Sequence, residues 1–91
     1  MYALAKLDGE VLAEMGEKLR ALRKQKRYSQ AQLAGRIGVS RKHICDIEAG
    51  RGTTLLTFIK LLKEFRKSDK LLEILSGPSL SPKDTFEKEH A

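Results

Sequence analysis

The sequence predicts an all-α fold, a compact bundle of five helices, and three observations lead to this prediction. Apolar residues recur at spacings of three and four in five successive segments, which is the period of an α-helix. Residues suited to helix ends, above all serine at the start and glycine at the end, separate several of these segments. No segment shows the apolar–polar alternation of a β-strand.

The first helix is expected over residues 10–26, with Asp8 and Gly9 as its candidate starting residues, after an N-terminal extension of residues 1–9. Its apolar stripe consists of Leu12, Met15, Leu19 and Leu22. Because these positions share one side of a helix, that side is expected to face the core.

Two short helices joined by a tight turn are expected next. Ser29 is a good N-cap for the first of them, and Gly38 suits the left-handed turn that ends it. Ser40 can cap the second helix, in which Ile44 and Ile47 are expected to face inward.

Two further helices are expected in the second half of the chain. The fourth, after Thr54, has an apolar stripe of Leu55, Phe58, Ile59, Leu62 and Phe65. The fifth carries the apolar residues Leu71, Leu72, Ile74 and Leu75. Gly77 and Pro82 then interrupt the pattern, so the domain is expected to comprise residues 10–76 and the tail residues 77–91.

Positive charge is concentrated in the middle of the chain. The protein has 18 Lys and Arg against 12 Asp and Glu, a net charge of +6, but residues 18–51 alone carry +8 and residues 1–17 carry −3. A block this basic attracts polyanions, of which nucleic acid is the commonest in the cytosol. Charge alone leaves open two other partners for this block, an anionic membrane or an acidic protein. It also leaves open that the block is simply the solvated face of a helix.

Length and composition argue against several other classes of protein. A chain of 91 residues holds one small domain, which is too short for a large catalytic fold. No uncharged stretch approaches the roughly 20 apolar residues of a membrane span, and no secretory signal pattern opens the chain. The single cysteine, Cys45, lies two residues from His43 without further ligands at metal spacing. We therefore expect a cytoplasmic protein, nucleoid-associated where its polyanion is nucleic acid, with no membrane contact, catalytic residues, metal or cofactor.

Residues 30–48, QAQLAGRIGVSRKHICDIE, resemble the helix-turn-helix of the Cro and phage-repressor family, also called the XRE family. The first, fifth, ninth, fifteenth and eighteenth positions of that motif are here Gln30, Ala34, Gly38, Ile44 and Ile47. The resemblance continues through MGEKLRALRKQKRYS before the motif and IEAGR after it. It covers about residues 15–75 and implies a lambda-repressor-like fold that binds double-stranded DNA.

In this family the second helix of the motif lies in the major groove with its N-terminal residues against base edges. The resemblance therefore implies that Arg41, Lys42 and Asp46 read bases. Arg41 and Lys42 suit guanine O6 and N7, whereas Asp46 either accepts from a cytosine amino group or pairs with Lys42 four residues earlier. Lys42 can equally meet a phosphate, and Ser40 can serve as a cap alone. Contacts to the DNA backbone are expected from Gln30, Ser40, His43 and Arg51.

Two structural features also follow from the resemblance. Arg23 and Glu48 occupy the positions of a buried ion pair found in some family members, so we expect them to pair. Family members usually bind palindromic DNA as two-fold dimers. The expected homodimer interface is the fifth helix, with Leu71, Leu72, Ile74 and Leu75 and a contribution from Leu80, and the alternative is that these residues belong to the domain's own core.

The sequence leaves more than one function open. The broader expectation is a transcriptional regulator, a dimeric repressor that reads a palindromic operator. The alternative is an antitoxin resembling the HipB type, which represses its own operon and also binds a toxin, with the arm after Pro82 as the binding segment. A third reading is a protein-interaction module that does not read DNA, against which the basic Arg41 and Lys42 argue.

Overall fold

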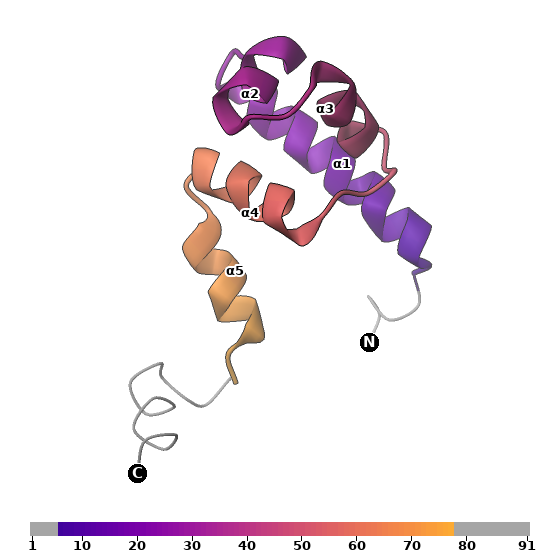
Figure 1. Cartoon of the computed structure of the whole chain (residues 1–91). Helices are drawn as coiled ribbons and strands as arrows, with labels where there is room; N and C mark the ends of the chain where they lie inside the picture. Colours follow the sequence, from indigo (N-terminus) through magenta and orange to yellow (C-terminus); the bar gives the residue numbers. More distant parts are fainter. Residues whose placement is uncertain (1–5, 78–91) are drawn as a thin grey trace.

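The computed structural model describes residues 6–77 of the 91-residue chain, and this part is helical without any strand. Its helices are α1 (Asp8–Gln25), α2 (Gln30–Ile37), α3 (Arg41–Glu48), α4 (Leu55–Glu64) and α5 (Ser68–Leu75). The prediction of an all-α fold with five helices is confirmed for these residues (Figure 1). Leu80 and all but the first residue of the predicted tail, residues 77–91, lie outside the described part.

Serine hydroxyls cap α2 and α3. Ser29 Oγ accepts a hydrogen bond from the backbone N–H of Gln32 at 3.0 Å, and Ser40 Oγ accepts one from that of His43 at 3.0 Å. Gly38, with φ of 78°, adopts the left-handed conformation that ends α2. The predicted caps and the predicted turn are confirmed, and together they hold α2 and α3 in a fixed short connection.

The first helix begins at Asp8, one of its two candidate starting residues and two residues before the predicted segment 10–26. A carboxylate oxygen of Glu10 accepts a hydrogen bond from the backbone N–H of Leu7 at 2.9 Å, which satisfies one of the free donors at this helix end. Asp8 and Glu10 also place negative charge at the positive end of the helix dipole. These polar interactions extend α1 beyond its apolar stripe, so part of the predicted N-terminal extension is helical.

Helices α1, α2, α3 and α4 surround one core, to which α4 contributes through its contact with α2. In Figure 1, α1 passes behind α2 and α3 while α4 lies below them. The core residues are Leu19, Leu33, Ala34, Ile37, Ile44, Ile47, Leu61 and Phe65. Leu33 and Ile44 are each only 1% exposed because α2 and α3 meet through their apolar sides. The core thus anchors α3 by its inner side and leaves its outer side to the solvent.

Helix α1 comes very close to the end of α3 at Gly16. A Cβ atom on Gly16 would lie 2.6 Å from the carbonyl oxygen of Ile47 and 2.7 Å from that of Glu48. Both distances are shorter than van der Waals contact, so only glycine permits this approach. The glycine therefore sets how deeply the C-terminal end of α3 packs against α1.

The buried side of α4 differs from the predicted stripe. Leu61, absent from that stripe, is 2% exposed and Phe65 is 6% exposed, whereas Leu55 is 70% exposed. The expectation that Leu55 faces the core is therefore wrong. The buried row runs through Thr57, Leu61 and Phe65 at intervals of four, and Thr57 is tolerated there because its hydroxyl hydrogen-bonds with that of Thr54 at 3.1 Å.

Helix α5 packs against α4 and points away from the other three helices (Figure 1). It contains no buried residue. Leu72, Ile74 and Leu75 are 67%, 76% and 79% exposed, and Leu71 is half-buried. In the described part of a single chain, Leu72, Ile74 and Leu75 therefore lie outside the core, whereas Leu71 is partly covered by the contact of α5 with α4.

Candidate nucleic-acid interface

The outer side of α3 carries three charged side chains that the sequence predicts to contact DNA bases. Ile44 and Ile47, 1% and 5% exposed, fix the inner side of the helix in the core. Arg41 and Lys42 lie in its first turn and are exposed, and Asp46 follows one turn later and is half-buried. The helical period brings Lys42 and Asp46, four residues apart, to one side of α3, while Arg41 lies at the start of the helix beside Gln30.

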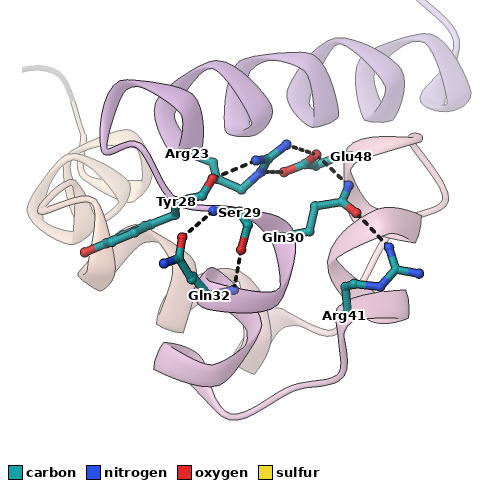
Figure 2. A network of polar contacts seen from close by, with 7 residues as sticks. All are labelled: Arg23, Tyr28, Ser29, Gln30, Gln32, Arg41 and Glu48. Atoms are coloured by element: carbon teal, nitrogen blue, oxygen red, sulfur yellow. Dashed lines mark hydrogen bonds and ion pairs between the residues drawn. The ribbon is translucent and has the colours of Figure 1, made fainter.

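A line of hydrogen bonds connects the protein interior to Arg41 (Figure 2). Arg23 Nε donates to Glu48 Oε2 at 2.6 Å, and Arg23 Nη2 donates to Glu48 Oε1 at 3.0 Å. Gln30 Nε2 donates to the same Oε1 at 3.1 Å, and Gln30 Oε1 accepts from Arg41 Nη1 at 3.3 Å. The exposed guanidinium of Arg41 is thus oriented by a side chain that is itself held by a buried carboxylate.

The structure brings Arg23 and Glu48 into direct contact, with their side chains only 9% and 7% exposed. The third nitrogen of the guanidinium, Nη1, donates to the backbone oxygen of Tyr28 at 2.8 Å. Burial acts to raise the pKa of Glu48, but the hydrogen bonds from Arg23 and Gln30 outweigh it, so this pKa lies below its ordinary value. Hydrogen bonding to Glu48 raises the pKa of Arg23. Both side chains are therefore charged at neutral pH.

Asp46 lies between two cations from different parts of the chain. Its Oδ1 accepts from Arg51 Nη1 at 2.7 Å, and its Oδ2 lies 3.3 Å from Lys42 Nζ. These hydrogen bonds, first the one from Arg51 and then the one from Lys42, hold the pKa of Asp46 below its ordinary value. The pairing with Lys42, one of the two roles weighed for Asp46, is present, and Arg51 joins it from the loop after α3.

The predicted backbone-contact residues lie at the start of α2, at the start of α3 and in the loop after α3. His43 Nε2 forms a hydrogen bond with Thr53 Oγ1 at 2.7 Å, and Ser40 is engaged as the cap of α3. His43, Asp46, Arg51, Gly52, Thr53 and Thr54 line a hollow of about 290 Å³ beside α3. Gln30 lies apart from this hollow at the start of α2, where the first backbone N–H groups favour an anion.

Two residues have contacts that sequence reasoning missed. Gln30 was expected to contact only the DNA backbone, yet it also links Glu48 to Arg41. Thr53 was not predicted to contribute at all, yet it holds His43. These contacts could not be predicted from local sequence patterns, because the hydrogen-bonded residues lie 10 to 18 positions apart along the chain.

Residues 6–77 include no helix long and apolar enough to cross a membrane. Within the same part of the chain, no three His, Cys, Asp or Glu side chains gather as a metal site would require.

Comparison with known proteins identifies the family. Residues 19–72, more than half of the chain, match the family model described as helix-turn-helix, of the XRE type. Comparisons with curated proteins and with solved structures gave no significant match. The matched range contains α2, α3 and α4 with parts of α1 and α5, and the five helices have the lambda-repressor-like arrangement. The chain therefore belongs to the XRE-type helix-turn-helix family of DNA-binding transcription regulators.

Proposed function

We propose that this protein is a sequence-specific transcriptional repressor that binds a palindromic operator as a homodimer. The observation that carries the proposal is the hydrogen-bonded line from the buried Arg23–Glu48 pair through Gln30 to Arg41. It places a bidentate donor at a defined position on the exposed side of α3. A side chain that is oriented before binding loses less entropy when it meets a base, which favours sequence reading over general attraction.

Each part of the interface has a role in this proposal. Helix α3 enters the major groove, where Arg41 and Lys42 donate to guanine O6 and N7. Asp46, the third residue predicted to read bases, is already engaged by two cations. Backbone phosphates are met by Gln30, Ser40, His43 and Arg51. These contacts position the protein on the duplex, whereas the base contacts specify the sequence.

The homodimer in this proposal forms through α5. Leu72, Ile74 and Leu75 are each at least 67% exposed in the described part of the single chain. An apolar helix side of this kind is favourable only when another surface covers it, because exposed apolar area is costly in water. A second copy of α5 supplies such a surface and places two α3 helices on successive turns of the major groove, about 34 Å apart.

The antitoxin role has no specific support. The segment predicted to bind a toxin, the arm after Pro82, lies outside the described residues.

Selection of binding sites from random duplex DNA tests the proposal. The full chain should enrich a palindrome whose half-sites are centred about one helical turn apart. A promoter overlapping the enriched site should be silenced when the protein is expressed. A flat sequence profile from a folded protein would contradict sequence reading, and activation of the promoter would contradict repression.

A further inference from the structure

Asp46 is less accessible than the two cations that it joins. The side chain of Asp46 is 29% exposed, whereas those of Lys42 and Arg51 are 80% and 68% exposed. Lys42 Nζ lies 3.5 Å from Oδ1 and 3.3 Å from Oδ2, and Arg51 Nη1 lies 2.7 Å from Oδ1. The carboxylate therefore lies behind the two positive groups and connects a side chain of α3 to one of the loop that follows.

This arrangement differs from that of a side chain that reads a base. An aspartate that accepts from a cytosine amino group must present its oxygens to the groove. Here both oxygens of Asp46 face cations of the protein, and Lys42 and Arg51 extend farther into the solvent. DNA that approaches α3 thus meets the two cations before it meets the carboxylate.

The hollow beside α3 adds a second consequence. Asp46 and Arg51 line it together with His43 and Thr53. A phosphate that entered this hollow to meet Arg51 would also approach the negative charge of Asp46. Like charges at close range oppose binding, and phosphate contacts account for essentially all of non-specific DNA affinity. The carboxylate therefore weakens the interaction that does not depend on sequence.

We propose that Asp46 is a positioning residue that raises DNA specificity, because it holds Lys42 and Arg51 in fixed places and disfavours binding to non-cognate duplex. This inference rests on the proposed function as a sequence-reading protein. On cognate DNA, Lys42 loses little rotamer entropy when it contacts its base, because Asp46 already holds its side chain in place. On non-cognate DNA, no base contact compensates for the repulsion between Asp46 and phosphate.

The substitution Asp46→Asn tests this role, because it removes the charge and keeps the size of the side chain. We expect affinity for a scrambled duplex to rise about three- to tenfold, while affinity for the selected operator changes less. The ratio of the two affinities should therefore fall. Asp8→Asn is the matched control, since Asp8 is an exposed aspartate in the first turn of α1 and its loss should leave that ratio unchanged.

A double-mutant cycle separates positioning from direct base reading. In a Lys42→Ala/Arg51→Ala background, Asp46→Asn should have little further effect on the affinity ratio, because its partners are gone. If Asp46→Asn still changes the preferred base at one operator position in that background, Asp46 reads the base itself and the inference is wrong. If the wild-type chain selects a palindrome but Asp46→Asn leaves the ratio unchanged, the inference alone fails. A wild-type chain that selects no site contradicts the proposed function instead.

Discussion

The Arg23–Glu48 pair is the most constrained polar group at the residue scale. All three guanidinium nitrogens donate to protein oxygens, and no buried side-chain nitrogen or oxygen among the described residues lacks a partner. A buried pair of this kind adds little stability compared with apolar residues, but losing one partner leaves an uncompensated charge. The pair therefore acts mainly by defining where Gln30, and through it Arg41, lies.

Replacing only Arg23 should destabilise the fold more than replacing both Arg23 and Glu48. We expect Arg23→Met to lower the free energy of unfolding by about 3 to 5 kcal/mol, because Glu48 is left buried without its cation. The double variant Arg23→Met/Glu48→Leu should regain much of this loss. Denaturant unfolding followed by circular dichroism measures both, and a single variant as stable as the double one would contradict the burial argument.

The pair also predicts how stability depends on pH. The pKa of Glu48 in the folded protein lies below the ordinary value of 4.5. A lowered pKa contributes stability that is complete above the ordinary value and is lost as pH falls through the folded-state pKa. We therefore expect the wild type to lose more stability than the Arg23→Met/Glu48→Leu variant when the pH falls below about 4.5. Unfolding curves at a series of pH values test this, and equal losses in both proteins would rule out the role of Glu48.

Arg41 and Arg51 should differ in what their loss does to DNA binding. Arg41→Ala should abolish one base preference in each half-site, at about 1 to 3 kcal/mol of discrimination. Arg51→Ala should weaken binding to all sequences alike and make the salt slope of log K less steep by about 0.9. Binding titrations at several salt concentrations, on operators varied one base at a time, distinguish these outcomes. If Arg41→Ala also lowered affinity equally for all operator sequences, Arg41 would contact a phosphate and not a base.

At the element scale, the approach of α1 to the end of α3 decides where the recognition helix lies. Gly16 allows this contact because the carbonyl oxygens of Ile47 and Glu48 occupy the space of its missing side chain. The helix ends are set more locally, by hydroxyl caps and by the left-handed Gly38. The α2–α3 unit is thus defined by local signals, whereas its placement on α1 depends on packing.

The two glycines Gly16 and Gly35 provide a matched test of this packing. Gly16→Ala should lower the free energy of unfolding by about 1 to 3 kcal/mol, because the new Cβ atom overlaps the backbone of α3. Gly35→Ala, on the exposed side of α2 with no atom within 4 Å of its Cβ position, should be neutral or stabilising by up to about 1 kcal/mol. Thermal unfolding of both variants tests the comparison, and a harmless Gly16→Ala would show that α1 can move away from α3.

At the scale of the whole molecule, basic and apolar surfaces lie on different elements. The outer side of α3 carries the cations, whereas α5, on the far side of α4, carries exposed leucine and isoleucine side chains (Figure 1). A dimer through α5 would therefore leave both α3 helices free for DNA. This separation lets variants of α5 test association without altering the groups proposed to contact DNA.

Leu75→Glu should weaken dimerisation about tenfold or more while leaving the fold intact, because Leu75 is 79% exposed in the single chain. Sedimentation equilibrium should show a shift toward monomer, and binding to the full palindrome should weaken with it. Leu55→Glu is a matched control, since Leu55 is 70% exposed but belongs to α4. Dissociation by Leu55→Glu and not by Leu75→Glu would move the interface from α5 to α4.

Much of this architecture could be predicted from local patterns. Ser29, Gly38 and Ser40 mark helix ends through interactions within a few residues, so their roles were readable along the chain. The family motif made Arg41, Lys42 and Asp46 candidates for DNA contact, and all three lie on α3, where Lys42 and Asp46 pair. The interface contacts of Gln30 and Thr53, by contrast, could not be predicted, since they depend on partners that only the fold brings near.

The sequence alone therefore determined the helices, most of their caps, the family and the basic surface, because helix period, capping and charge are local properties. Only the tertiary structure decided that Leu61 rather than Leu55 lies in the core, that Leu72, Ile74 and Leu75 are exposed within residues 6–77, and that Asp46 lies between Lys42 and Arg51. The physical reason is that periodicity shows which side of a helix is apolar, whereas burial and ion pairing depend on which other elements pack beside it.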